Sequence, residues 1–372
     1  MPRSYRIYLI GFFLAVIYSV PLAQTAAEIV RGERLQFLNV FREAPTAANL
    51  RAFEHELERS SVVAASVRPA TQYFWFATLR NPGEKAVAGR DGWFFYKPDV
   101  RYLVEPLDDT GAMSAILAFR RQLAARGIHL LVMPVPGKPS VYPDRLSRRA
   151  RATDGPGLSH TAGLIARLRA AGVDTVDILE AIERWRREDG PSAEPYYLMR
   201  DTHWSGRAAR RVAELAAVEI RTRGWIAEGS TEYVTRAVRV PRRGDVIRML
   251  EAPELDGSFP PEQVPCQQVL SKSTGALYRD DPGSPVLVLG DSFSRMYQTD
   301  EPTAAGFIAH LARELHTPLA SIVNDGGAST LVRQQLARRA GLLVGKKLVI
   351  WEFVERDIRF GAEGWQAVPL PE

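Results

Sequence analysis

Two short motifs, far apart in the chain, carry side chains suited to acyl transfer. Residues 286–289 form an apolar run that leads into Gly290, Asp291 and Ser292, a pattern typical of a buried strand that ends in a turn. In an open α/β sheet, functional groups gather at the carboxyl ends of the strands. Ser292 would be exposed there, among backbone N–H groups able to stabilise an oxyanion. A helix cap at Asp291 or Ser292 is the plainer alternative.

The second motif supplies a base for such a serine. Asp201 and His203 are two residues apart, and in an extended segment this spacing points both side chains to the same side. The carboxylate can then hold the imidazole Nδ1–H. Ser205 is a candidate N-cap, and the positive end of the following helix disfavours an imidazolium. A serine hydroxyl needs such a base because it barely ionises at neutral pH. A lone histidine would more simply be structural.

Strands and helices alternate around both motifs. Predicted strands are residues 128–135, 173–176, 286–289, 319–323 and 348–353; predicted helices are 113–126, 161–171, 205–223, 303–315 and 330–340. This alternation favours an α/β fold with a mainly parallel sheet. An Asp-Gly pair inside residues 87–96 predicts a hairpin, and residues 224–281 are expected to be an irregular insertion. Glu352 and Arg356, four apart, suggest a structural ion pair.

The N-terminus carries a targeting pattern. Arg3 and Arg6 precede an uncharged apolar run over residues 7–23, which is typical of an export signal and long enough for a short membrane span. We therefore predict a signal peptide or membrane anchor over residues 1–26 and a helical lead-in over 27–80. A catalytic domain over 81–372 follows, outside the cytoplasm.

Composition excludes several classes of protein. Apolar residues make up 46% of the 372, which rules out wholesale disorder. The net charge is only +5, without a basic run interleaved with aromatics, so nucleic acid is not an expected partner. The single cysteine, Cys266, excludes an internal disulfide. Because no histidine pair has ligand spacing, neither a metal nor another cofactor is predicted.

The motifs together resemble one family. Residues 290–294 (Gly-Asp-Ser-Phe-Ser), with 201–204 (Asp-Thr-His-Trp) upstream, look like the alginate O-acetyltransferase family, whose members are similar to AlgJ and AlgX. Residues 89–95, 136–143 and 351–356 fit the same family, and the likeness covers about residues 80–360. It implies a three-layer, SGNH-hydrolase-like α/β domain with a mainly parallel sheet. By the resemblance, Ser292 is the nucleophile, His203 the general base and Asp201 its orienting acid.

The resemblance also implies partners and a location. Such proteins act in the periplasm, some anchored to the inner membrane, and move acetyl groups onto exopolysaccharide hydroxyls. A membrane-bound O-acyltransferase delivers the acetyl group, and other polysaccharide biosynthesis and export proteins take part. The chain ends soon after Arg356, so we expect it to lack the C-terminal carbohydrate-binding module of some members. The acceptor is accordingly open between alginate and a related polymer such as cellulose.

Five further residues are candidates for substrate contact, and all but Trp204 have a structural alternative. Trp204 could wall the site. Tyr297, a helical turn beyond Ser292, could touch the acyl group or sugar, or pack in the core. Asn324 could donate to the oxyanion or form a plain turn, and Lys138 and Tyr142 could bind an acidic sugar or belong to an ordinary loop.

Two other functions use the same residues. A carbohydrate acetyl esterase would employ the same three residues, Ser292, His203 and Asp201, with water as acceptor. A non-catalytic scaffold of a polysaccharide export complex would keep them only as a vestige. The presence of all three argues against the scaffold.

Overall fold

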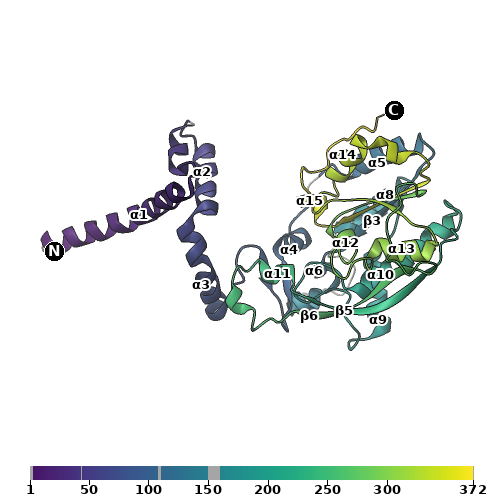
Figure 1. Cartoon of the computed structure of the whole chain (residues 1–372), viewed down its shortest axis with the longest axis horizontal. Coiled ribbons are helices and arrows are strands. Elements are labelled where there is room, and N and C mark those ends of the chain that lie inside the picture. Colours follow the sequence, from purple (N-terminus) through teal and green to yellow (C-terminus); the bar gives the residue numbers. More distant parts are fainter. Residues whose placement is uncertain (1–2, 43, 108–109, 150–159, 372) are drawn as a thin grey trace. The chain divides into compact units, whose positions relative to one another are not determined.

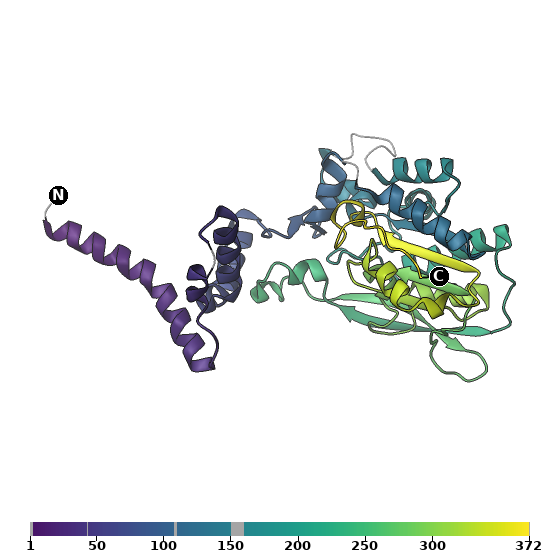
Figure 2. The ribbon, with the colours of Figure 1, turned by 90° about the horizontal axis from the view of Figure 1, so that it is seen from above.

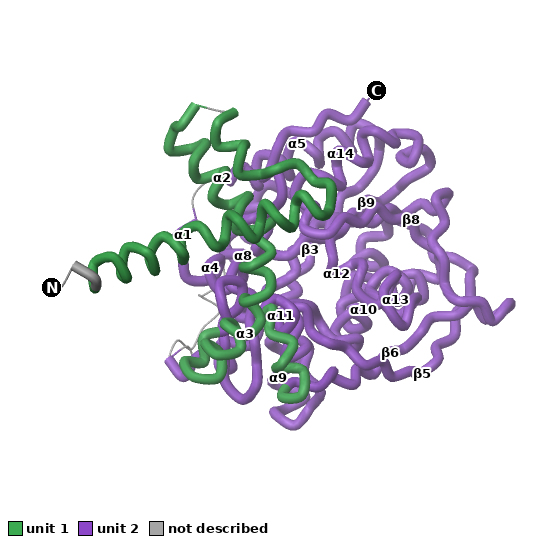
Figure 3. Tube along the Cα trace, turned by 60° about the vertical axis from the view of Figure 1, so that its left-hand side comes forward, with its two compact units in different colours: residues 1–81, 251–258 green, residues 82–250, 259–372 purple. Residues whose placement is uncertain are grey.

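The computed structural model describes residues 3–42, 44–107, 110–149 and 160–371. The chain divides into two compact units, which Figure 3 distinguishes by colour. The first unit contains residues 1–81 and 251–258, and the second contains residues 82–250 and 259–372.

The first unit is helical. It consists of α1 (Arg3–Arg31), a 3₁₀ turn (Gln36–Phe41), α2 (Ala47–Ser60), α3 (Val62–Leu79) and a second 3₁₀ turn (Pro253–Leu255). Within the described residues, Tyr5–Arg31 is the one stretch of helix long and apolar enough to cross a membrane.

One helix of the first unit differs from the sequence-based expectation. The predicted lead-in begins at residue 27, but α1 runs without a break across that boundary, from the apolar segment to Arg31. No glycine or proline lies between Gln24 and Arg31, so nothing interrupts the hydrogen-bonded ladder there. The helix ends at Gly32, whose φ of 69° lies in the left-handed region that favours glycine.

A five-stranded parallel sheet forms the centre of the second unit, in the order β4-β3-β9-β7-β8. The strands are β3 (His129–Val135), β4 (Asp174–Thr175), β7 (Val286–Gly290), β8 (Ala320–Val323) and β9 (Leu348–Val354). Strands β7 and β9 are buried at every position, as expected for a parallel sheet covered on both faces. The predicted α/β fold is confirmed.

Helices cover both faces of the sheet, giving three layers (Figures 1 and 2). Along β9, Val349, Trp351 and Phe353 join one hydrophobic core, while alternate residues join the other. The first core includes α5 (Ala112–Ala124), α8 (His160–Ala170) and α14 (Leu331–Arg338). The second includes α9 (Ile178–Asp189), α10 (Gly206–Arg223) and α13 (Phe307–Leu315).

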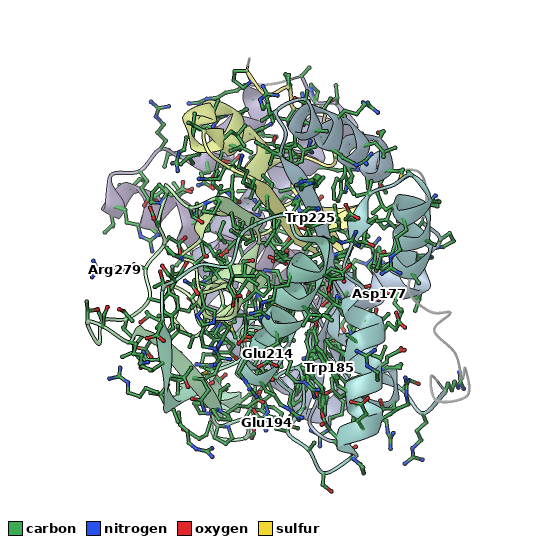
Figure 4. The ribbon with its side chains drawn as sticks, turned by 90° about the vertical axis from the view of Figure 1, so that its right-hand side faces the viewer. Asp177, Trp185, Glu194, Glu214, Trp225 and Arg279 are labelled. Carbon is green, nitrogen blue, oxygen red and sulfur yellow. The ribbon has the colours of Figure 1, made fainter. Side chains whose placement is uncertain are left out.

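Figure 4 looks onto the second of these layers. Asp177 and Trp185 mark α9, and Glu214 marks the neighbouring α10. The two helices are joined by Arg211, whose guanidinium lies 4.3 Å from the ring centroid of Trp185 and 3.1 Å from the carboxylate of Asp189. This layer supports the segment that leads into α10.

Two smaller sheets complete the second unit. The predicted hairpin is present as β1 (Ala86–Ala88) and β2 (Phe94–Tyr96), with Asp91 and Gly92 both at positive φ. The segment expected to be irregular instead contains two ten-residue antiparallel strands, β5 (Tyr233–Arg242) and β6 (Glu262–Ser271). Each of these strands contains a proline. Because proline favours turns and is tolerated in a sheet mainly at edge positions, the sequence did not indicate a pair of strands here.

Short helices line the carboxyl edge of the main sheet. They are α4 (Lys97–Val104), α6 (Lys138–Val141), α7 (Pro143–Leu146), α11 (Asp245–Arg248), α12 (Ser292–Arg295) and α15 (Asp357–Phe360). Since the strands are parallel, their carboxyl ends meet at this edge. Lys138 follows β3, Ser292 follows β7, Asn324 follows β8 and Arg356 follows β9. Chemistry-bearing residues from four strands therefore gather in one place.

Candidate active site

Ser292, His203 and Asp201 form a continuous chain of hydrogen bonds. The Ser292 hydroxyl lies 2.8 Å from Nε2 of His203, and Nδ1 of His203 lies 2.6 Å from Oδ1 of Asp201. Asp201 is fully buried, while Ser292 keeps 8% of its surface exposed. The three residues predicted as a unit are thus within hydrogen-bonding reach, in the order that nucleophilic catalysis by a serine requires.

The turn after β7 holds Ser292 in place. Asp291 is the N-cap of α12: its Oδ1 accepts the Phe293 N–H at 2.8 Å, and its Oδ2 accepts the Val354 N–H from β9 at 2.8 Å. The capping role considered for Asp291 is therefore present. It leaves the hydroxyl of Ser292 free to face His203.

A buried carboxyl group lies beneath this turn. Oε2 of Glu352 accepts the Ser294 hydroxyl at 2.5 Å and the Asp291 N–H at 3.2 Å. Burial, with the charge of Asp291 adding to it, raises the pKa of Glu352 well above its usual value. A Cβ on Gly290 would come within 2.3 Å of Oγ of Ser294 and 2.8 Å of Oε2 of Glu352, so only glycine fits at this position.

The ion pair suggested between Glu352 and Arg356 is not formed. Nη1 of Arg356 instead donates to Oδ1 of Asp99 at 3.0 Å. The four-residue spacing brings side chains together only on a helix, whereas Glu352 lies within β9 and Arg356 follows that strand.

The carboxylate of Asp201 has further partners at the end of β5 and just after it. Its Oδ2 accepts the Asp245 N–H at 3.2 Å and lies 3.4 Å from Nε of Arg242. In turn, Asp245 accepts the Thr202 N–H at 2.7 Å and the Thr202 hydroxyl at 2.6 Å. Sequence reasoning missed Arg242 and Asp245, which lie some forty residues from the motif, because both fall in the stretch that was expected to be irregular.

These contacts set the charges of the site. Burial alone would lower the pKa of His203, but the hydrogen bond and charge of Asp201, with the charge of Asp245, raise it above the ordinary value of 6.5. Burial would raise the pKa of Asp201, but His203 and Arg242 lower it far below its usual range. Asp201 is therefore a carboxylate at neutral pH, oriented to stabilise a protonated His203.

The structure places Lys138 in a structural role. This side chain is fully buried, and Nζ donates to the backbone carbonyls of Leu198, Met199 and Asp201 at 3.0, 3.0 and 2.7 Å. Burial lowers its pKa to about 8, so the group is still an ammonium at pH 7. All three N–H donors are used inside the protein, so the expected contact with an acidic sugar does not fit. Lys138 instead secures the segment that carries Asp201.

Tyr142 is likewise occupied. Its hydroxyl accepts the Tyr196 N–H at 2.8 Å, and the Arg186 guanidinium lies 4.1 Å from its ring centroid. Trp93 packs on the ring at 4.6 Å between centroids. The side chain is buried, so the alternative of an ordinary structural residue fits better than sugar binding.

Trp204 and Tyr297 are fully buried in the core. Trp204 packs against Phe293 and Phe307 at 5.2 and 6.2 Å between ring centroids, and the Tyr297 hydroxyl donates to the carbonyl of Trp204 at 3.2 Å. Neither ring can stack on a sugar from this position. Trp204 therefore supports the site by packing against Phe293. Tyr297 packs in the core, which is the alternative considered for it.

Solvent reaches a different set of residues near Ser292. The backbone N–H of Asn324 donates to the Gly290 carbonyl at 3.0 Å, and its side chain is half-buried. Arg356 is partly exposed, with its guanidinium 6.0 Å from the Phe293 ring centroid and 5.3 Å from that of Tyr96. Tyr96 is half-buried as well. Sequence reasoning missed Tyr96 and Arg356 as candidates for substrate contact.

Among the described residues, Asp201, His203 and Asp245 have ligand-type atoms within 4.8 Å of one another, as a metal site would require. The same atoms already take part in hydrogen bonds: Asp201 with His203 and the Asp245 N–H, and Asp245 with Thr202. These hydrogen bonds explain why the three side chains lie close together: they position the imidazole of His203.

A three-layer α/β domain with a serine, a histidine and an aspartate joined at the carboxyl edge of its sheet has the architecture of the SGNH-hydrolase-like enzymes. Residues 86–355 match the family described as the SGNH hydrolase-like domain of the acetyltransferase AlgX. The chain belongs to this family of AlgJ- and AlgX-type O-acetylases, as the motifs at 201–204 and 290–294 predict.

Individual relatives are distant. The chain is 26% identical over 301 residues to the probable alginate O-acetylase AlgJ of Pseudomonas aeruginosa, covering 77% of this chain and 74% of the relative. Its counterpart in Azotobacter vinelandii is 25% identical over 299 residues, covering 77% and 72%.

Solved structures share the fold. The O-acetyltransferase domain of Pseudomonas putida AlgJ superposes with a TM-score of 0.57 at 23% identity, over 73% of this chain and 91% of that domain. AlgX of Pseudomonas aeruginosa superposes with a TM-score of 0.55 at 20% identity, over 72% and 61%.

Proposed function

We propose that this chain is a periplasmic O-acetyltransferase that moves acetyl groups onto hydroxyls of an exopolysaccharide. In this proposal Ser292 is the nucleophile, His203 the general base and Asp201 the acid that orients it. One observation carries the proposal: an unbroken chain of hydrogen bonds from Ser292 through His203 to Asp201, in a member of an acetyltransferase family.

The first step forms an acetyl-enzyme. Oγ of Ser292 attacks the carbonyl carbon of the donor's acetyl ester while its proton passes to Nε2 of His203. The tetrahedral intermediate then collapses, the bond to the donor's oxygen breaks, and His203 returns the proton to the departing alcohol. Asp201 stabilises the imidazolium between these two proton transfers.

The second step reverses these roles with a sugar as nucleophile. A sugar hydroxyl gives its proton to Nε2 of His203 and attacks the acetyl-serine carbonyl. As the ester bond to Ser292 breaks, His203 returns the proton to Oγ. The sugar leaves acetylated and the enzyme is restored.

Two groups could stabilise the negative oxygen of both intermediates. The backbone N–H of Ser292, at the start of α12, has no hydrogen-bond acceptor within the described part of the chain. The side chain of Asn324 comes from the neighbouring strand end, which is bonded to Gly290. Donors fixed before the reaction stabilise a developing oxyanion without the cost of reorganisation.

The acceptor is an exopolysaccharide, either alginate, after the names of the curated relatives, or a related polymer such as cellulose. The partly exposed residues beside Ser292 are suited to a sugar chain. The ring of Tyr96 can pack on a sugar, and Arg356 uses one N–H on Asp99, so its other N–H groups can meet a carboxylate or hydroxyl.

The rest of the chain places the enzyme at its substrate. In this proposal residues 1–26 direct export and anchor the chain to the inner membrane, 27–80 form a helical lead-in, and 81–372 form the acetyltransferase domain. A membrane-bound O-acyltransferase supplies the acetyl group, and other polysaccharide export proteins deliver the polymer. No soluble cofactor takes part in either step.

Acetyl transfer from p-nitrophenyl acetate to oligosaccharides, read by mass spectrometry, tests the proposal. The wild-type protein should give acetylated uronate or neutral oligosaccharides, and Ser292→Ala should give none. Ser273→Ala, an exposed serine in the β6 turn, is the matched control and should behave as wild type. A fluorophosphonate should label the control but not Ser292→Ala.

Two results would overturn the assignment. Release of acetate with every oligosaccharide tried, together with efficient deacetylation of an acetylated polymer, would make the protein a carbohydrate esterase with the same residues. No labelling by the fluorophosphonate and no turnover of any acetyl ester would leave the role of a scaffold.

A further inference from the structure

Polar contacts fix where α3 begins relative to the apolar part of α1. The apolar run ends at Ala23, and the next residue, Gln24, is buried. Its Oε1 accepts the N–H of Val62, the first residue of α3, at 2.8 Å, and its Nε2 donates to the Ser60 carbonyl at 3.2 Å. The start of α3 is therefore level with the point where the apolar segment ends.

A second buried group strengthens this junction. Glu28, one helical turn after Gln24, accepts the amide N–H of Gln24 at 2.8 Å and the backbone N–H of Gln36 at 3.0 Å. Cleavage near residue 26 would separate Gln24 from these partners. The geometry thus favours α1 as a retained anchor.

One side of α3 is exposed and carries no charge. Helical spacing places the following exposed residues on that side: Ser66, Val67, Ala70, Tyr73, Phe74, Ala77 and Thr78. Phe74 is 60% exposed. Trp75 and Leu79 are also exposed, but helical spacing places them on the other side of α3. On the opposite side Phe76 is buried. The one charged residue within α3, Arg68, is paired with Glu251 at 3.3 Å.

Helix α3 runs across the direction of α1. In Figure 1 α1 extends sideways from the N-terminus and α3 descends steeply from its far end, and in Figure 2 the view is along α3 while α1 is seen from the side. A helix that starts level with the end of a membrane span and lies across the axis of that span is placed to run along the membrane surface.

We propose that α3 is an interfacial helix that lies on the outer surface of the membrane crossed by α1, with the side of Val67 and Phe74 in the lipid. The inference rests on the anchoring of residues 1–26 proposed above. Tyrosine is enriched at the membrane–water interface, and phenylalanine is typical of the lipid side of interfacial helices; Tyr73 and Phe74 both lie on the proposed side. An uncharged apolar side of a helix lies readily in the headgroup boundary.

Labelled variants of the full chain, reconstituted in vesicles of phosphatidylethanolamine and phosphatidylglycerol, test this. A nitroxide is attached to Phe74→Cys on the proposed lipid side, or to Ala65→Cys, an exposed position on the opposite side. The native Cys266 is buried and is replaced by alanine in both variants. The measurement compares two collision rates of the nitroxide: with oxygen, which concentrates in lipid, and with a nickel chelate, which stays in water.

The nitroxide at position 74 should collide more often with oxygen than with the nickel chelate. The nitroxide at position 65 should collide more often with the nickel chelate. Equal exposure of both positions to the nickel chelate would place α3 in water and overturn the proposal. Shielding of position 74 from both reagents would show that protein covers this side, and dipolar broadening between labels would identify a second copy.

A second measurement separates the failure of this inference from failure of the proposed function. Phe74→Glu should leave the chain in the membrane through α1 but speed tryptic cleavage after the exposed Arg80, whereas Ala65→Glu should not. Turnover of p-nitrophenyl acetate should persist in both variants, because the reaction needs only the second unit. Equal cleavage of Phe74→Glu and wild type would contradict an interfacial α3, whatever the acetyl transfer assay gives.

Discussion

Oδ2 of Asp245 lies 3.6 Å from Nδ1 of His203, on the side of the imidazole that Asp201 already occupies. Two carboxylates therefore face one ring nitrogen. Asp201 makes the direct hydrogen bond to His203. Asp245 acts through Thr202, because it accepts hydrogen bonds from the N–H and the hydroxyl of Thr202. Asp245 is thus a positioning residue, and its charge adds to the rise in the pKa of His203.

Asp245→Asn should move the pH profile as well as slow the reaction. Removing its charge lowers the pKa of His203, so the acidic limb of the rate profile should shift to lower pH. Losing charged hydrogen bonds to Thr202 should reduce turnover on the plateau about tenfold, since such bonds contribute about 1.5–3 kcal/mol. The measurement is the rate of p-nitrophenyl acetate turnover against pH.

Asp174→Asn is the matched control for this experiment. Asp174 is a half-exposed carboxylate on β4 that pairs with Arg223, and its loss should leave the acidic limb where it was. If Asp245→Asn reduces turnover but leaves the acidic limb of the pH profile in place, Asp245 only supports the structure of the loop and does not set the pKa of His203.

His203 should affect stability and activity in opposite directions as pH rises. Its pKa is raised in the folded protein, so its contribution to stability is fully present below the unfolded value of about 6.5 and is lost as pH rises through the folded value. Catalysis needs the neutral imidazole, so turnover should rise through the same pH range. Urea unfolding of wild type and His203→Gln at several pH values measures the first effect, and their stability difference should shrink with pH. A difference that grows with pH would contradict the raised pKa.

The sequence predicted the parts of the site that depend on local pattern. The Asp-x-His spacing and the turn after an apolar strand are each contained in a few residues, and a parallel sheet then brings Ser292 and His203 to one edge. Burial could not be predicted in the same way, since Trp204 and Lys138 have residue types that occur equally at a binding site and in a core. Asp245 was missed because it follows β5. The prolines in β5 and in its partner β6 indicate a loop, although the two strands form a regular antiparallel pair.

Lys138→Met should destabilise the fold rather than weaken sugar binding. It would leave the carbonyls of Leu198, Met199 and Asp201 without their donor, at a cost of about 1–3 kcal/mol for each carbonyl that stays unsatisfied. We expect a lower midpoint of thermal unfolding, and reduced turnover because Asp201 is less well held. A raised KM for the oligosaccharide with an unchanged midpoint would restore Lys138 as a sugar contact.

Glu352 should tolerate an amide but not a truncation. Burial, with the charge of Asp291 adding to it, raises the pKa of its carboxyl group, and a neutral amide of the same shape can still accept hydrogen bonds from the Ser294 hydroxyl and the Asp291 N–H. Glu352→Gln should therefore stay within about threefold of wild-type turnover, whereas Glu352→Ala should lose stability of about 2–4 kcal/mol and most of the activity. Equal effects of the two variants would show that Glu352 acts as a charge.

Asn324 should matter most in the transition state. If its side chain donates to the oxyanion, Asn324→Ala should lower kcat about 10²–10³-fold and leave KM nearly unchanged. Asn324→Asp should do the same, because it removes the N–H donors while keeping the size of the side chain. The neighbouring Asp325→Asn is the control: Asp325 is exposed and paired with Arg295 at 2.7 Å, and its replacement should leave kcat within about twofold, as for most surface changes.

Gly327 gives an independent test of the same role. A Cβ at this position would come within 2.3 Å of Oδ1 of Asn324, so Gly327→Ala must push the Asn324 side chain out of place without altering its chemistry. A loss of kcat comparable to that of Asn324→Ala is expected, and combining the two changes should add little, because both remove one interaction. Independent, multiplying effects of Gly327→Ala and Asn324→Ala would show that Asn324 forms only a turn, and the oxyanion would then depend on the backbone N–H of Ser292.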